Sequence, residues 1–145
     1  MLSEWTSTPL SGIVFPDTER KMDPRVRDLF VKALRSGKYP QGYDRLRSID
    51  DTYTALGVLC DLATKVGAAS WDRVGDEYFI SGSQPPSTGG TLPVQVREWA
   101  GIEGTALSQE LPLRDLNGDL HPIWRVSDIF KVDFTVIADL IEAQY

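Results

Sequence analysis

The apolar residues of positions 24 to 35 recur with the i, i+3, i+4, i+7 spacing of one helix face. Asp23 before them is a favourable N-cap, and Pro24 suits the first helical position, where its missing N–H costs nothing. Gly37 stands where a left-handed residue ends many helices. The pattern therefore predicts a first helix that ends before Gly37. Its buried stripe is expected to contain Val26, Leu29, Phe30, Ala33 and Leu34.

Residues 54 to 66 are apolar around most of a helix circumference, so they predict the central buried helix of the fold. Gly67 is expected to end this helix, and one of residues 50 to 52 to cap it. Gly57 in its interior costs about 1 kcal/mol of helix propensity relative to Ala. We expect Gly57 to compensate by letting another backbone approach closely, for example that of the basic connection before the helix.

Four further signals complete the outline. Gly75-Asp76 divides one apolar stretch and predicts a short hairpin, and Asn117-Gly118 is the strongest two-residue hairpin signal of the chain. A short helix is expected after Leu92-Pro93, and a last helix from residue 134 to about residue 143. The prediction is an α+β fold in which three to four helices form a core with a small antiparallel sheet of hairpins. The residues expected to be nearly inaccessible are Leu29, Phe30, Leu34, Leu59, Leu62, Ile137 and Ile141.

The length of 145 residues suits one domain that covers residues 1–145. Residues 1–22 are expected to form an irregular N-terminal arm, and residues 81–90, rich in Ser, Gly and Pro, a flexible loop. The single cysteine excludes an internal disulfide, and the chain starts without the basic and apolar regions of a signal peptide. No apolar run approaches the roughly 20 residues that span a bilayer. We therefore expect a cytoplasmic protein that does not enter a membrane.

The charges are distributed unevenly along the chain. Residues 20 to 47 contain nine basic and three acidic residues, a net charge of +6, whereas the rest contains six basic and eighteen acidic residues, a net charge of −12. Such an asymmetry can steer an anion to one face, although a solvated helix face explains the same residues equally well. The overall charge of −6 argues against non-specific binding to duplex nucleic acid, which needs many phosphate contacts.

No catalytic, cofactor-binding or metal-binding motif is present in the sequence. Cys60 is surrounded by apolar residues, which favours an inert buried thiol over a nucleophile paired with His121. Residues 115 to 119 begin like a calcium-binding loop, but Leu120 and Val126 replace the glycine and the glutamate that such a loop requires. We therefore expect no enzyme activity, no cofactor and no metal site.

Four blocks of the sequence, with the spacing between them, cover about two thirds of the chain. The blocks are Ala33-Leu34-Arg35-Ser36-Gly37-Lys38-Tyr39 with Gln41-Gly42 and Leu46-Arg47, Leu56-Gly57-Val58-Leu59-Cys60-Asp61-Leu62-Ala63, Leu92-Pro93 with Val96 and Trp99-Ala100-Gly101, and Ile137-Ala138-Asp139-Leu140-Ile141-Glu142. Together they resemble a widespread group of small phage and prophage proteins. The resemblance implies a phage source and no particular activity. The chain departs from the group at Thr54-Ala55, where a Cys-Cys pair is frequent, and in the additional segment of residues 122 to 132. A metal or redox role based on that pair is therefore not expected.

Two functions remain open at this point. The first is a non-catalytic binder of a small anionic ligand, for which we expect a nucleotide that a phage protein would sequester as an immune signal of its host. Basic side chains would hold its phosphates, a tyrosine would stack on its base, and the N-terminal end of the second helix would add N–H donors. The second is a protein-interaction module that inhibits or redirects a host protein, with a homo-oligomer possible in either case. The ligand-binding residues predicted for the first function are Arg35, Lys38, Tyr39, Tyr43, Arg45, Arg47 and Thr54.

Overall fold

The computed structural model describes residues 22–82, 92–102 and 111–145, and confirms the α+β fold class. The predicted N-terminal arm and most of the predicted flexible loop lie outside these residues. The described helices are α1 (Pro24–Arg35), α2 (Ala55–Lys65), α3 (Val94–Ala100), α4 (Ile123–Asp128) and α5 (Phe134–Gln144). The described strands are β1 (Trp71–Val74), β2 (Glu77–Ile80), β3 (Pro112–Arg114) and β4 (Leu120–Pro122).

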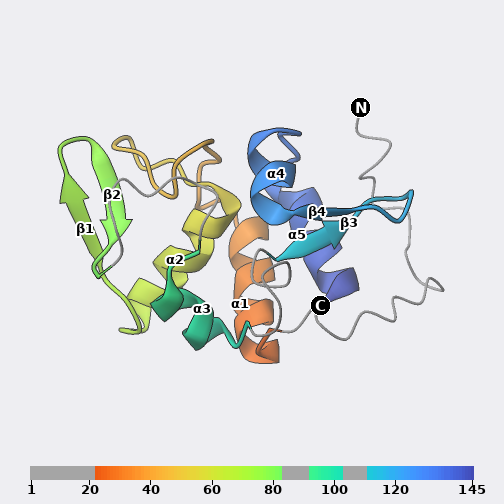
Figure 1. Ribbon diagram of the computed structural model, residues 1–145, viewed down its shortest axis with the longest axis horizontal. Coiled ribbons are helices and arrows are strands. Elements are labelled where there is room, and N and C mark those ends of the chain that lie inside the picture. The colour runs from red at the N-terminus through yellow and green to blue at the C-terminus, as the bar shows by residue number, and fades with distance from the viewer. Residues whose placement is uncertain (1–21, 83–91, 103–110) are drawn as a thin grey trace.

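The helix α1 stands in the middle of the molecule and packs on α5 along one side and on α2 along the other (Figure 1). The hairpin of β1 and β2 lies at one end, beyond α2, whereas the hairpin of β3 and β4 lies at the opposite end, beside α4 and α5 (Figure 1). The backbone N–H of Asp23 donates to the carbonyl of Ala100 at 2.8 Å, which joins the end of α3 to the start of α1. The hairpins form two separate two-stranded sheets on one helical core.

The helix ends follow the local signals in the sequence, with one correction. Asp23 accepts a hydrogen bond from the backbone of Arg25 at 2.8 Å at the start of α1, and Gly37 adopts a φ of +74° after its end. The predicted cap of α2 among residues 50 to 52 is wrong. Thr54 is the cap, and its hydroxyl oxygen accepts from the N–H of Gly57 at 3.1 Å. The first N–H groups of a helix have no partner within the helix, and at the buried start of α2 water cannot supply one. The hydroxyl of Thr54 pairs one of these groups.

Both predicted hairpins are present. In the first, Trp71 pairs with Ile80, and Gly75-Asp76 forms the turn as expected. In the second, Asn117-Gly118 belongs to a five-residue connection between β3 and β4 rather than to a two-residue turn. The reason is Asp115, whose carboxylate accepts from the backbone of Asn117 at 2.9 Å and of Asp119 at 3.0 Å and so closes the longer loop.

Five of the seven residues expected to be inaccessible are buried: Phe30, Leu34, Leu59, Ile137 and Ile141. Leu62 is half-buried, and Leu29 is 44% exposed, so the expectation for Leu29 is wrong. The physical reason is that α1 lies between two helices. Its buried side therefore includes Val31, which is 5% exposed, whereas Leu29 remains exposed.

Candidate functional site

The connection between α1 and α2, residues 36–54, carries most of the predicted ligand-binding residues. Its backbone is tied into a compact loop, because Gly42 donates to the carbonyl of Tyr53 at 2.7 Å and Tyr53 donates to that of Pro40 at 2.9 Å. Leu46 is fully buried and anchors the loop in the core. The basic side chains of this connection therefore project from a backbone whose course is set by hydrogen bonds and packing.

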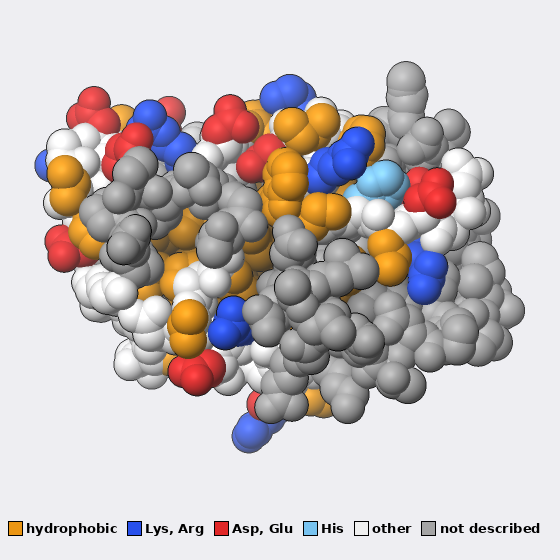
Figure 2. Space-filling view, in the orientation of Figure 1, with side chains coloured by type: hydrophobic (Ala, Val, Ile, Leu, Met, Phe, Trp, Pro, Cys, Tyr) orange, Lys and Arg blue, Asp and Glu red, His pale blue; other side chains and the backbone are white. Residues whose placement is uncertain are grey.

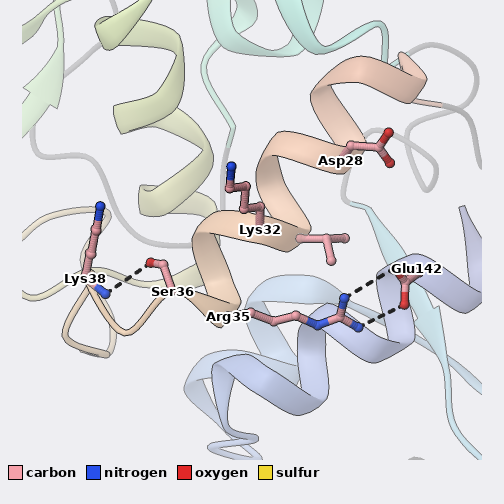
Figure 3. A pocket seen from close by; sticks show the side chains of 7 residues that line it. Asp28, Lys32, Arg35, Ser36, Lys38 and Glu142 are labelled. Atoms are coloured by element: carbon pink, nitrogen blue, oxygen red, sulfur yellow. Dashed lines mark hydrogen bonds and ion pairs between the residues drawn. The ribbon is translucent and has the colours of Figure 1, made fainter.

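Arg35, at the end of α1, reaches across to α5. Its guanidinium lies 2.6 Å from a carboxylate oxygen of Asp139. It also lies 2.9 Å from a carboxylate oxygen of Glu142 (Figure 3). Hydrogen bonds to Glu142 and Asp139 raise the pKa of Arg35, and the bond from Arg35 lowers the pKa of Glu142. Arg35 is thus a charged link between α1 and α5 at neutral pH.

An open pocket of about 610 Å³ lies beside this link. Figure 3 shows that Lys32 and Lys38 point away from the ion pair of Arg35 and Glu142. Among the described residues, neither lysine has a carboxylate within ion-pair distance, and both are exposed. The pocket therefore presents two ammonium groups that have no carboxylate partner within residues 22–82, 92–102 and 111–145, next to an arginine that is paired with Asp139 and Glu142. Its lining consists of Asp28, Val31, Lys32, Arg35, Ser36, Lys38 and Glu142.

Arg45 and Arg47 turn toward the first hairpin and do not line this pocket. Arg45 lies 3.2 Å from the carboxylate of Glu77 on β2. Arg47 lies 2.7 Å from the carboxylate of Asp51, and its guanidinium is 3.9 Å from the ring centroid of Tyr78. These contacts, a salt bridge and a cation–π interaction, hold the hairpin on the connection. The structure thus separates the predicted basic set into two groups.

The other three predicted residues lie in different surroundings. Tyr39 is 9% exposed, and its hydroxyl donates to Asp61 at 2.5 Å, which leaves little of its ring for a ligand. Tyr43 is half-exposed, with the ammonium of Lys131 3.9 Å from its ring centroid. Thr54 is buried as the cap of α2, so its hydroxyl is engaged within the protein.

The sequence reasoning missed Asp61, around which a polar cluster forms inside the protein. Asp61 accepts from the hydroxyl of Tyr39 and, at 3.0 Å, from the indole N–H of Trp71, and Lys65 lies 3.5 Å away. Burial raises the pKa of Asp61, but the hydrogen bonds of Tyr39 and Trp71 and the charge of Lys65 outweigh it and lower the pKa below its usual value. The sequence did contain a signal for this cluster: Asp61 is the one acidic residue in a helix predicted to be buried. A buried charge requires polar partners, so polar side chains were to be expected around it.

The remaining candidate chemistry lies in separate places. The thiol of Cys60 is fully buried in α2, and burial raises its pKa. His121 lies in the second hairpin, where its Nε2 is 3.0 Å from the carboxylate of Asp115. Within residues 22–82, 92–102 and 111–145, no group of three or more His, Cys, Asp or Glu side chains could hold a metal ion. In the same ranges, every helix is too short or too polar to cross a bilayer.

These observations define a small α+β protein with a helical core, two hairpins and an open pocket that carries basic side chains. The chain belongs to the family described as a domain of unknown function (DUF8296), which matches residues 22–145. No curated protein matches it significantly, and no solved structure does.

Proposed function

We propose that the protein is a non-catalytic binder of a small anionic ligand, held in the pocket beside α1. The observation that carries the proposal is the pair of exposed ammonium groups, Lys32 and Lys38, which lack a carboxylate partner among the described residues. Lysine is a common phosphate binder, since its ammonium offers three hydrogen-bond donors and a full charge.

Arg35 has a supporting role in this pocket. Because its guanidinium is engaged by Asp139 and Glu142, it holds α1 against α5 and neutralises charge that the pocket would otherwise present to an anion. Ser36 adds a hydroxyl to the lining, and this hydroxyl accepts from the N–H of Lys38 at 3.1 Å. The proposal therefore concentrates on Lys32 and Lys38, with Arg35 beside them.

The finer proposal concerns the ligand and the setting. If the protein comes from a phage, as the resemblance of its sequence implies, the ligand is a nucleotide immune signal of the host, and binding in the host cytoplasm sequesters it. The described lining contains no aromatic side chain, so the phosphates rather than the base provide the contacts. Binding of this kind needs no catalytic group.

Calorimetric titration of the protein with a nucleoside triphosphate and with pyrophosphate tests the proposal. Lys32→Ala and Lys38→Ala should each weaken binding roughly 10-fold, the value of one charge-assisted hydrogen bond. The matched control is Arg25→Ala, because Arg25 is on the same helix with its side chain 91% exposed, and screening by solvent should limit its effect to less than a few-fold. An equal loss in Arg47→Ala would place the ligand at the first hairpin, and equal small losses in all variants would refute an anion site.

A second candidate function is a protein-interaction module, favoured by an exposed apolar surface at the end of α4. Ile129 is 59% exposed and Phe130 38% exposed, and hydrophobic side chains gather over α4 beside basic ones (Figure 2). Exposed apolar groups of this kind occur at protein interfaces. Ile129→Ser should abolish capture of a host protein and leave anion binding unchanged, whereas Lys38→Ala should do the reverse. Retained capture by the Ile129→Ser variant would exclude this surface.

A further inference from the structure

Glu142, near the end of α5, holds the guanidinium of Arg35 by two hydrogen bonds. The Nη1 atom of Arg35 donates to one carboxylate oxygen of Glu142 at 3.3 Å, and Nη2 donates to the other at 2.9 Å. Arginine binds phosphate groups with the same two-point geometry. Figure 3 shows the two side chains facing each other, and both line the pocket beside α1. Glu142 therefore occupies the donors of Arg35 that an anionic ligand in this pocket would use.

Asp139 binds the same guanidinium from a different place. Its carboxylate accepts from Nη2 of Arg35 at 2.6 Å, a shorter contact than either one to Glu142. Of the described residues, Glu142 lines the pocket and Asp139 does not. The side chain of Glu142 is also the more exposed of the two, at 62% against 41%. Arg35 thus has one carboxylate partner within reach of a ligand and a second that is outside the pocket.

The position of α5 does not depend on Glu142. The side chain of Gln144 accepts from the backbone N–H of Arg114 at 2.7 Å and donates to its carbonyl at 2.9 Å. Arg27 on α1 donates to the carbonyl of Tyr145 at 3.0 Å, and α5 buries an apolar face in the core. Exposed ion pairs add little to stability, because water solvates the separated charges well. Glu142 can therefore leave Arg35 at small cost while α5 stays in place.

The charges of the pocket favour such a departure when an anion binds. Lys32 and Lys38 line the pocket and have no carboxylate within ion-pair distance among the described residues. The other acid of the lining, Asp28, lies 3.1 Å from Arg27 and is thereby neutralised. An anion drawn to the two ammonium groups comes close to the carboxylate of Glu142, and like charges repel each other. The same anion offers Arg35 new acceptor oxygens.

We propose that Glu142 is an internal competitor of the ligand, and that an anion entering the pocket replaces it on Arg35. The anion takes the two donors that Glu142 held, Glu142 turns to solvent, and Asp139 keeps Arg35 on α5. This inference rests on the proposed function, since it needs an anion in the pocket. It also defines the ligand class, a diphosphate group. Such a group has enough charge and acceptor oxygens to meet both lysines and to displace a carboxylate.

Calorimetric titration with pyrophosphate tests the replacement in variants that each lose one negative charge. Glu142→Gln should bind roughly 10-fold tighter than the wild type, because it frees a charge-assisted donor of Arg35. Asp139→Asn should change the affinity by less than a few-fold, since Asp139 is not in the pocket lining. Glu98→Gln, at an exposed position of α3, controls for the net charge and should bind like the wild type. The 62% exposure of the Glu142 side chain means that its variant keeps the fold, which thermal unfolding verifies.

The gain in Glu142→Gln should depend on Arg35. Adding Arg35→Gln, which removes the charge but leaves a hydrogen-bond donor for Asp139, should weaken binding roughly 10-fold relative to Glu142→Gln alone. Equal affinities of the single and the double variant would show that loss of a negative charge is sufficient to improve binding. That result would overturn the replacement on Arg35.

The replacement and the anion site fail in different ways. If the wild type binds pyrophosphate and Glu142→Gln binds it no more tightly, the replacement is wrong and the anion site stands. The same conclusion follows if Asp139→Asn or Glu98→Gln tightens binding as much as Glu142→Gln does. If neither the wild type nor Glu142→Gln binds pyrophosphate, the anion site is refuted, and the replacement with it.

Discussion

The carbonyl oxygen of Leu46 lies directly against the Cα atom of Gly57. A Cβ atom added to Gly57 would be 1.6 Å from that oxygen and 2.6 Å from the carbonyl carbon, distances that no side chain can have. The close approach that the sequence predicted for Gly57 is therefore confirmed, and the approaching backbone is that of the basic connection, as expected. This contact fixes the connection on α2, and the first prediction tests it.

We expect Gly57→Ala to destabilise the protein, although alanine is the better helix former by about 1 kcal/mol. The added methyl group must push Leu46 away from α2, and overpacking of a core of this kind costs roughly 3 kcal/mol. Urea denaturation measures the difference. The control is Gly37→Ala, where no atom lies within 4 Å and only the positive φ is unfavourable, at a cost of about 1 kcal/mol. Equal losses in both variants would mean that the contact has no steric role.

The second prediction compares two neighbours on α1. Phe30 is fully buried, so Phe30→Ala should cost about 3–5 kcal/mol through the cavity that it leaves. Leu29 is 44% exposed, so Leu29→Ala should cost less than about 1 kcal/mol. Thermal and urea unfolding of the two variants checks the order. A large loss in Leu29→Ala would show that this side chain is covered in solution, for instance by a second copy of the chain.

Leu29 also shows how far the sequence determines the fold. Helix ends, caps and turns depend on neighbouring residues, so Asp23, Gly37 and Gly75-Asp76 were predicted correctly from local signals. The spacing of apolar residues identifies a helix but does not say which neighbours it will have. Because α1 packs on helices at both sides, Val31 is buried where the simple stripe predicted Leu29.

The candidate site could be predicted only in part, for a related reason. The cluster of basic residues is visible in the sequence, but the carboxylates that bind them come from distant parts of the chain. Arg35 meets Asp139 and Glu142 on α5, and Arg45 meets Glu77 on β2. A net charge along a segment therefore does not show which side chains are free, and only the packing of α5 and of the first hairpin separates Lys32 and Lys38 from the rest.

The third prediction concerns the two tyrosines that the sequence placed in the site. The hydroxyl of Tyr39 donates to the carboxylate of Asp61, and hydrogen bonds to charged groups contribute about 1.5–3 kcal/mol. Tyr39→Phe should lower the free energy of unfolding by about this amount. Tyr43→Phe should leave it nearly unchanged, since Tyr43 is half-exposed and its main contact, with Lys131, is made by the ring. If anion binding by Tyr39→Phe also stays intact, Tyr39 has a structural role.

The last prediction concerns the loss of folding stability at acid pH, to which Asp61 should contribute. The pKa of Asp61 is lower in the folded protein than in the unfolded chain, where it is about 4. The stability that its charge contributes is therefore fully present above about pH 4. This stability is lost as the pH falls through the pKa of the folded state. Asp61→Asn removes this charge and leaves Tyr39 and Trp71 with a weaker acceptor, at a cost of roughly 1–3 kcal/mol at pH 7.

The deficit of the Asp61→Asn variant should shrink at pH 2.5, where the wild-type carboxylate is also being neutralised. Urea denaturation of both proteins at the two pH values measures it, with Asp76→Asn as a control for an exposed carboxylate. A deficit that is equal at pH 7 and pH 2.5 would mean that the charge of Asp61 adds nothing to the cluster. In that case its hydrogen bonds to Tyr39 and Trp71 would be worth no more than those of a neutral amide, and burial alone would hold α2 against the first hairpin.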